Sequence, residues 1–392
     1  MRTCIYCGLD KPDDEFSDEH IWPDALGGDH LPTLWRTDDV CACCNHMSGL
    51  FVDGYFVKSW IGFAERSTGA REYLSPSRTR VGVLPLNYMG SLRDVPTNEG
   101  EIAEYWCGPC GARIIHIRPT DSDEHWKSYA GGDPRAKKPE AGRAYLTLRS
   151  DKTFWINVGL ASFKAHFKKA QRFVVNMDVP TQWSDSVKGL DANDPVQASD
   201  MKVVNAPASA VHGDNRKRTG AVIQSDACDR LLAKLGLAIG YKLFGAPFLD
   251  TSNARNLRKY FREANRANRQ QIPVRLRGFF DEKVLGGAEM KLSWPGGWVL
   301  LLKVVNQVLS LIVISPSGKS MTVVVCDQPA LVAGLDAVYQ DGSVWVTIPT
   351  LREAVGPVPF HAFLAHQMGA SALPELETLA GKRIDPAVLP PC

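Results

Sequence analysis

The stretch that decides the N-terminal fold begins Cys4-Ile5-Tyr6-Cys7 and ends Cys41-Ala42-Cys43-Cys44-Asn45. Two Cys-x2-Cys pairs at this separation can supply the four thiolates that a tetrahedral structural zinc site requires. We therefore predict one zinc ion bound by Cys4, Cys7, Cys41 and Cys44. An alternative set, in which Cys43 replaces Cys41 or Cys44, stays open.

The loop between the cysteine pairs carries Glu19-His20, and Asn45 follows the last cysteine directly. A histidine titrates near neutral pH, so His20 is suited to act as a general base toward water. Carboxylate and amide oxygens are ligands that Mg²⁺ accepts, and a site with few protein ligands keeps several waters. Glu19 and Asn45 are accordingly candidate ligands of a divalent cation, and the three residues together indicate metal-assisted hydrolysis.

Length and composition are those of an ordinary folded protein. The 392 residues exceed what one core usually serves, and 44% are hydrophobic and 22% charged. No apolar run reaches the roughly 18 residues of a membrane span, and the first residues lack a secretory signal. We expect a cytoplasmic protein whose ten cysteines are reduced or bind metal, with no disulfide framework.

Charge is distributed unevenly along the chain. Residues 10–39 hold ten acids against two bases, whereas residues 251–280 hold eight bases against one acid. Helical spacing brings five of the bases near one face, where they can contact phosphates. These five are Arg255, Arg258, Lys259, Arg262 and Arg266. A solvated helix face, a protein partner, or pairing with the acidic segment are the alternatives.

Hydrophobic periodicity indicates an α+β chain with three regions. Residues 1–65 form a small zinc-bound head, residues 66–219 a linker with a mixed α/β region, and residues 220–392 a helical hairpin with an antiparallel sheet. Residues 131–139 and 180–219 read as loops. The predicted helices are 47–64, 154–167, 228–244, 253–268 and 361–367. The predicted strands are 81–86, 114–117, 144–148, 172–177, 290–294, 298–305, 308–315, 321–326 and 344–348.

The motif Trp106-Cys107-Gly108-Pro109-Cys110 has the letters of the thioredoxin redox site. That chemistry needs the first cysteine at a helix N-terminus, whereas the residues after Cys110 read as a strand. We interpret Cys107 and Cys110 as unreactive thiols in a turn. A second metal site formed with His116 is the alternative.

The combination of Cys-x2-Cys, Glu19-His20-Ile21-x-Pro23, Gly27-Gly28 and Cys-x2-Cys-Asn resembles the HNH endonucleases, specifically the zinc-knuckle subgroup of the ββα-metal nucleases. The resemblance covers residues 1 to about 60. It implies that His20 is the general base, that Glu19 and Asn45 hold Mg²⁺ or Mn²⁺, and that the four cysteines hold Zn²⁺. One position departs from the family pattern, because Arg36 stands where a middle Asn orients the base. His46 could join the catalytic metal, although adjacent helical positions such as Asn45 and His46 point in different directions. Asp53 is expected on the helix surface, with the metal edge as the alternative.

The resemblance implies an endonuclease that cleaves DNA, or alternatively RNA. The long region after the head suggests regulation. By analogy, such a fusion looks like a bacterial antiviral defence effector that is controlled by a guide complex, a nucleotide signal or a regulatory protein. An oligomer is possible. The competing hypothesis is a non-catalytic, zinc-stapled adaptor that binds nucleic acid or protein and whose HNH chemistry has lapsed.

Overall fold

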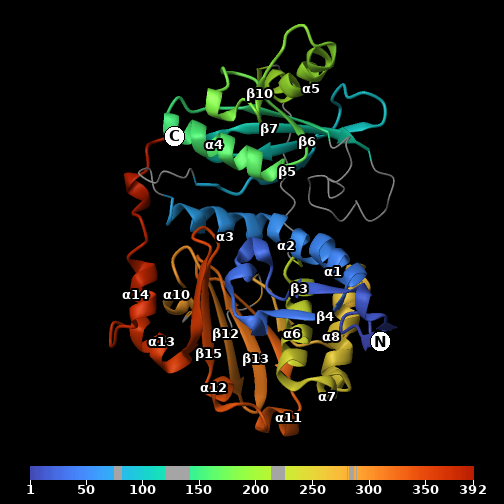
Figure 1. The fold of residues 1–392 in the computed structure, drawn as a ribbon, viewed down its shortest axis with the longest axis vertical. Helices are drawn as coiled ribbons and strands as arrows, with labels where there is room; N and C mark the ends of the chain where they lie inside the picture. Colours follow the sequence, from blue (N-terminus) through green and yellow to red (C-terminus); the bar gives the residue numbers. More distant parts are fainter. Residues whose placement is uncertain (75–81, 121–141, 213–225, 280, 282–286, 288) are drawn as a thin grey trace. The chain divides into compact units, whose positions relative to one another are not determined.

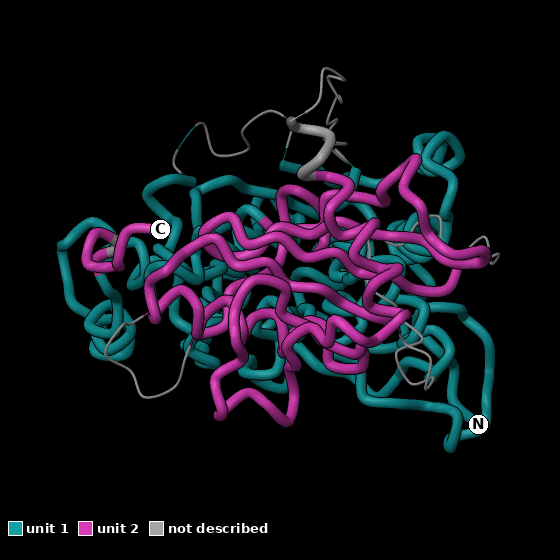
Figure 2. The backbone as a smooth tube through the Cα atoms, turned by 90° about the horizontal axis from the view of Figure 1, so that it is seen from above, with its two compact units in different colours: residues 1–57, 64–73, 224–384 teal, residues 58–63, 74–223, 385–392 magenta. Residues whose placement is uncertain are grey.

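The structure is a computed structural model that describes residues 1–74, 82–120, 142–212 and 226–392, except 280, 282–286 and 288. The described residues form two compact units (Figure 2). Unit 1 comprises 1–57, 64–73 and 224–384, and unit 2 comprises 58–63, 74–223 and 385–392. The N-terminal head and the C-terminal region therefore share one unit.

Unit 1 is built on a six-stranded antiparallel sheet, which confirms the predicted C-terminal sheet (Figure 1). Its strand order is β11 (Leu276–Arg277), β14 (Ser320–Cys326), β13 (Val308–Ile314), β12 (Trp298–Val305), β15 (Ser343–Ile348) and β16 (Glu353–Pro359). Successive side chains of a strand point to opposite faces, and here both faces are buried. Leu300 and Leu302 belong to the core of one face, and Val299 and Leu301 to the core of the other.

Helices cover both faces of this sheet. The second face packs with Phe363 of α13 (Phe360–Gln367) and Leu376 of α14 (Pro374–Ala380). The first face packs with α6 (Asp229–Phe244), whose residues 231–240 are all buried. After α6 come α7 (Ala246–Leu249), α8 (Ser252–Arg262) and α9 (Arg266–Arg269). The remaining short helices of unit 1 are α10 (Glu289–Leu292), α11 (Pro329–Ala333) and α12 (Ala337–Gln340).

The head has the order strand, strand, helix. Strands β3 (Phe16–His20) and β4 (Arg36–Cys41) pair antiparallel, with His20 opposite Arg36. The helical part begins with α1 (Ala42–Ser48), continues through a π-helical turn (Gly49–Asp53) and passes into α2 (Gly54–Lys58) and α3 (Trp60–Arg71). Ahead of this hairpin, the short strands β1 (Arg2–Thr3) and β2 (Asp10–Lys11) pair around the first cysteines.

The core of the head is continuous with the core of the sheet. Trp22 meets Trp298 edge to face with ring centroids 5.6 Å apart, and Trp35 meets Trp345 in the same way at 5.3 Å. All four rings are fully or almost fully buried. Such large buried rings dominate the energetics of a core, so the head depends on the sheet for its packing.

The turn that carries Gly27 shows how closely the two parts approach. The Gly27 carbonyl accepts a hydrogen bond from Thr347 Oγ1 at 3.1 Å. A Cβ added to Gly27 would lie 2.2 Å from Thr347 Oγ1. The φ of Gly27 is +92°, which is strained for any residue other than glycine. Gly27 is therefore required both by the turn and by the sheet beneath it.

Unit 2 is a second six-stranded sheet with helices on both faces. The strands, in spatial order, are β10 (Lys188–Gly189), β9 (Gln171–Val174), β8 (Arg143–Thr147), β7 (Arg113–Pro119), β6 (Glu101–Cys107) and β5 (Asn87–Ser91). Strands β8 and β9 are parallel and are joined through α4 (Thr153–His166), whose Leu160 and Phe163 lie in the core of one face. Helix α5 (Pro195–His212) contributes Val203 and Val204 to the other face.

The mixed α+β character is confirmed, and some local predictions are wrong. Residues 180–219 were expected to be a loop but contain α5, whose apolar positions are spread among polar residues. Residues 290–294, expected as a strand, lie in and after α10. Leu86, the last residue of the predicted strand 81–86, precedes β5 without strand pairing. The expected loop 131–139 lies outside the described residues.

The prediction that all ten cysteines avoid disulfides is also wrong. Cys110 and Cys392 are bonded to each other within unit 2, with their Cα atoms 5.1 Å apart. Because the two positions are far apart in sequence, no local pattern points to this pair. Cys107 is free, and its thiol donates to the Tyr105 hydroxyl at 3.5 Å. In the ranges that the structure covers, no helix has both the length and the apolar character to cross a bilayer.

Candidate metal and catalytic site

The first feature of the site is a cluster of four sulfur atoms. The Sγ atoms of Cys4, Cys7, Cys41 and Cys44 all lie within 4.8 Å of one another. In a tetrahedral zinc site with Zn–S bonds of about 2.3 Å, each pair of sulfurs is about 3.8 Å apart. The donor set therefore fits zinc in number, chemistry and spacing. Cys43 is exposed and outside the cluster, which removes it as a replacement ligand in this arrangement.

The cluster already favours negative charge on sulfur. The Cys41 N–H donates to Cys4 Sγ at 3.3 Å. A hydrogen bond from Cys44, with help from backbone donors, lowers the pKa of the Cys4 thiol to about 4, whereas the same bond raises the pKa of Cys44. A cation at the centre would replace these shared protons, since metal ligands must be deprotonated.

The predicted basic helix contacts this cluster from outside. Arg258 Nε donates to the Ile5 carbonyl at 2.9 Å, and Arg262 Nη1 donates to the Cys7 carbonyl at 3.2 Å. The guanidinium groups thus place positive charge beside the zinc knuckle Cys4–Cys7, and the zinc site carries negative charge when four thiolates bind the ion. Of the five predicted phosphate contacts, Arg258 is half-buried, and Arg255, Lys259, Arg262 and Arg266 are exposed. Arg266 lies beyond the end of α8, in α9.

Strand β3 points its predicted residues to opposite sides. Glu19 is 3% exposed and faces the interior. Its Oε1 atom lies 2.7 Å from Lys234 Nζ and accepts a hydrogen bond from the Tyr6 hydroxyl at 3.2 Å. Asp18 is exposed and His20 is half-buried, so the strand separates the buried Glu19 from its two neighbours.

Lys234 is the main residue that the sequence reasoning missed. It is fully buried on α6, and its Nζ also contacts Asp53 Oδ2 at 2.7 Å and the His20 carbonyl at 3.0 Å. Burial alone would lower the pKa of Lys234, but Asp53 and Glu19 together raise it above its usual value. Burial raises the pKa of Asp53 to about 6, partly offset by Lys234. The available signal was a single lysine in the middle of the apolar run from Leu231 to Ile239.

Asp53 reaches Lys234 from the π-helical turn that follows α1. A π turn inserts an extra residue into a helix and changes the direction of the side chains after it. From the sequence, Asp53 was expected on the helix surface, with the edge of a metal site as the alternative. The structure instead shows Asp53 beside Lys234, on the interior side of the hairpin.

Asn45 has a fixed orientation. Its side-chain N–H₂ group donates to Ser17 Oγ at 3.0 Å and to the Asp18 carbonyl at 2.8 Å. The opposite amide orientation would place two oxygens against each other, so these contacts determine which end points to β3. The Oδ1 atom is the remaining acceptor of this side chain, on the first turns of α1.

His20 contacts a residue that the sequence analysis did not single out. His20 Nε2 lies 3.0 Å from Asp29 Oδ1. Arg36 Nη2 donates to the same carboxylate and to the Asp29 carbonyl at 2.9 Å. The hydrogen bond with His20, followed by the charge of Arg36, keeps the pKa of Asp29 below its usual value. Arg36, the departure from the family pattern, is thus part of the surroundings of His20.

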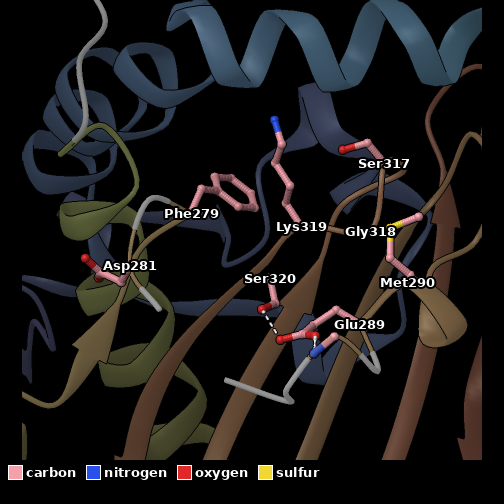
Figure 3. A pocket seen from close by; sticks show the side chains of 9 residues that line it. Phe279, Asp281, Glu289, Met290, Ser317, Gly318, Lys319 and Ser320 are labelled. Atoms are coloured by element: carbon pink, nitrogen blue, oxygen red, sulfur yellow. Dashed lines mark hydrogen bonds between the residues drawn. The ribbon is translucent and has the colours of Figure 1, made fainter. Parts of the chain in front are cut away.

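A small cavity elsewhere in unit 1 is separate from these residues (Figure 3). Its volume is about 170 Å³, and its lining includes Phe279, Glu289, Met290 and Lys319. Glu289 accepts hydrogen bonds from Ser320 Oγ and from the Gly287 N–H. None of the predicted site residues is among those that line it.

Comparison with known proteins agrees with the N-terminal geometry. Residues 4–61 match the family model described as HNH endonuclease. Neither the curated proteins nor the solved structures compared with the chain include a significant match. The match spans both cysteine pairs, the β3–β4 hairpin, α1 and the π-helical turn.

Proposed function

We propose that the HNH endonuclease domain at residues 4–61 makes this chain a metal-dependent nuclease that hydrolyses DNA phosphodiester bonds. The observation that carries the proposal is that His20 and Asn45 both belong to the β3–β4 hairpin and the helix that follows it. His20 ends β3, and Asn45 on α1 is hydrogen-bonded to the same strand, at Asp18. A base and a neutral oxygen ligand are thereby held on one hairpin and the helix after it.

The proposed roles follow from the chemistry of the groups. His20 accepts a proton from the attacking water, a step for which an imidazole is suited near neutral pH. Asn45 offers Oδ1 to a divalent cation, because its N–H₂ group is occupied by β3. Mg²⁺ or Mn²⁺, when bound, stabilises the charge that develops on the phosphate and the leaving oxygen. The cysteine cluster holds Zn²⁺ and shapes the fold of the head.

The carboxylate that binds the cation can be Glu19 or Asp18. Glu19 binds the cation only if the cation displaces Lys234 Nζ from Glu19 Oε1, since the two atoms are paired in this structure. Asp18 is the neighbouring carboxylate on the exposed side of β3, and Arg36 Nη1 is 3.6 Å from its Oδ2. The test compares the Mg²⁺ concentration that Glu19→Gln and Asp18→Asn require for cleavage. The residue whose substitution raises this concentration is the ligand.

We propose that the exposed bases of α8 contact DNA phosphates. Among the described contacts, Arg258 and Arg262 donate to backbone carbonyls of the zinc-binding segment, whereas Arg255 and Lys259 do not. The long remainder of the chain is proposed to regulate the nuclease. By analogy with similar fusions, its context is antiviral defence, in which a guide complex, a nucleotide signal or a protein partner licenses cleavage.

The Glu19–Lys234 ion pair favours one second candidate function. If that pair excludes the cation permanently, the domain is a zinc-stapled adaptor that binds nucleic acid or protein without cleaving it. Binding without cleavage under all metal conditions is the signature of this alternative.

The direct test is nicking of supercoiled plasmid by the full chain with Mg²⁺ or Mn²⁺, with and without chelator. We expect metal-dependent nicking that His20→Ala lowers by roughly 10²- to 10⁴-fold. His361→Ala is the matched control, because His361 is exposed on α13 and takes part in none of the described contacts of the site. Full activity in His20→Ala, or no activity in the wild-type chain with any divalent cation, contradicts the proposal.

A further inference from the structure

The starting observation is the residue opposite His20 in the hairpin. His20 and Arg36 are directly paired across β3 and β4, so their side chains lie on the same face of the two strands. In the HNH pattern this part of the hairpin carries an amide that orients the base. A guanidinium cannot accept a hydrogen bond and cannot take over that role directly.

The structure shows a third residue between the two. Asp29 lies in the short 3₁₀ turn Gly28–His30, which places its carboxylate over the His20–Arg36 pair. Arg36 holds both the carboxylate and the backbone carbonyl of Asp29. Two contacts from one guanidinium, one of them to the main chain, fix the position of the carboxylate more firmly than a single exposed ion pair would.

We propose that Asp29, anchored by Arg36, is the residue that orients the catalytic base His20 and selects its tautomer. The proposal rests on the proposed function of His20. An ionised carboxylate only accepts hydrogen bonds, so the Asp29 contact requires a proton on His20 Nε2. The neutral imidazole then has its lone pair on Nδ1, and Nδ1 is the atom that takes the proton from water. Arg36 acts through Asp29 and has no contact with the reacting atoms.

A surface ion pair without a catalytic role would show the same contacts, but its loss would not change turnover. His20 is 29% exposed and Asp29 50% exposed by side chain, and exposed pairs of this kind contribute little to stability. Asp29 can therefore be changed with little risk to the fold. A loss of turnover without a loss of stability separates an orienting residue from a structural one.

The spectroscopic experiment uses the full-length, zinc-loaded protein labelled with ¹⁵N-histidine, with the His20 signals identified by their absence in His20→Gln. Wild-type His20 is expected as the Nε2–H tautomer, and Asp29→Ala is expected to give a mixture of both tautomers. The tautomer of His20 is measured without any cleavage, so this experiment tests the inference even if the chain has no nuclease activity. An unchanged His20 tautomer in Asp29→Ala overturns the proposal.

The kinetic experiment measures plasmid nicking at saturating Mg²⁺. Asp29→Ala is expected to lower kcat about 10- to 100-fold, with KM changed less than about 3-fold, as for residues that hold a catalytic group in place. Asp29→Asn retains an acceptor oxygen and should recover part of the loss. Asp24→Asn, an exposed acid in the same head, is the matched control and should match wild type.

A double-mutant cycle tests the role of Arg36. Because Arg36 is proposed to act through Asp29, Asp29→Ala combined with Arg36→Gln should lose no more turnover than Asp29→Ala alone. Additive losses would mean that Arg36 has a separate role and would overturn the proposed chain of contacts. A wild-type chain that cleaves nothing refutes the nuclease function, and the tautomer measurement still decides the orientation of His20.

Discussion

Lys234 Nζ lies 2.7 Å from Glu19 Oε1 and the same distance from Asp53 Oδ2, and the lysine is fully shielded from solvent. One cation from α6 thus pairs with one oxygen of each of two carboxylates of the head and also donates to the carbonyl of His20. The strand that presents the proposed base is held in place by a residue far along the chain. This contact links the proposed catalytic hairpin to the C-terminal part of unit 1.

Replacing Lys234 with Met should destabilise unit 1 by about 3–5 kcal/mol, because two buried carboxylates would lose their counter-charge. Equilibrium urea unfolding of the zinc-loaded protein measures the loss. Lys242→Met, exposed on the same helix, should change stability by less than about 0.5 kcal/mol. Adding Glu19→Gln and Asp53→Asn to Lys234→Met should recover much of the loss, and a Lys234→Met protein as stable as wild type would refute the role of this ion pair.

Cys44→Ser should abolish stoichiometric zinc binding, because a hydroxyl does not replace a thiolate in a tetrahedral sulfur site. Elemental analysis of purified protein gives the metal content, with one zinc per chain expected for wild type. Cys43→Ser is the neighbouring control and should keep its zinc, since Cys43 is exposed and outside the cluster. Equal zinc in Cys44→Ser and wild type would rule out the assigned ligand set.

Changing Arg255 and Lys259 together to Gln should weaken DNA binding and reduce its salt dependence. Each lost phosphate contact lowers the slope of log K against log salt by about 0.9 on duplex DNA. Turnover at saturating DNA should change little, because neither residue contacts the proposed catalytic groups. Fluorescence anisotropy over a salt series measures the effect.

The control for that experiment removes the same charge elsewhere, through Lys168→Gln and Lys169→Gln in unit 2, where both side chains are exposed. Equal losses in both double variants would indicate a general charge effect and no specific role for α8. Arg258 and Arg262 are unsuitable for this test, since their bonds to the Ile5 and Cys7 carbonyls also hold the zinc knuckle.

Asp229 should make stability depend on pH between about 4 and 6. Burial, and then the charge of Asp226, raises the pKa of Asp229 to about 6 at the start of α6. A carboxyl whose pKa is raised in the folded state stabilises that state below its unfolded pKa, and the contribution is lost as pH rises through 6. Asp229→Asn cannot ionise, so it should gain up to about 2 kcal/mol over wild type as pH goes from 4 to 7.

Urea unfolding of both proteins at several pH values gives this difference. Subtracting the two curves removes the pH dependence of zinc binding, which they share. The two proteins should be almost equally stable near pH 4, where the side chain at position 229 is neutral in both folded states, and this serves as the internal control. A difference that does not vary between pH 4 and 7 contradicts the predicted ionisation.

Elements with strong local patterns were predictable from sequence. The C-terminal strands were recognisable because Trp298–Val305 and Val308–Ile314 are apolar except for Lys303 and Ser310 and are joined by a two-residue turn. The zinc cluster was recognisable because both cysteine pairs have the spacing that the metal imposes. Helix α5 was missed because its apolar face is weak, and the Cys110–Cys392 bond because nothing local connects two positions so far apart.

The candidate site was predictable in part, for the same reason. Asn45 follows the second knuckle, and its orientation depends on nearby strand atoms. Neither the inward direction of Glu19 nor its pairing with Lys234 could be predicted, because both depend on α6 packing against the hairpin. Strand alternation predicts that Glu19 and His20 point in opposite directions, but it does not say which of them faces the interior.

The contacts of Trp22 with Trp298 and of Trp35 with Trp345 have a consequence for synthesis in the cell. The head leaves the ribosome first, but the rings that complete its core are translated roughly 300 residues later, about 15–60 s at the usual rates of elongation. During that interval the nascent head cannot bury its tryptophans against the sheet. The β3–β4 hairpin of a nascent chain therefore lacks the packing of the sheet until β12 and β15 have been made, so the activity proposed for it would begin only after most of the chain has been synthesised.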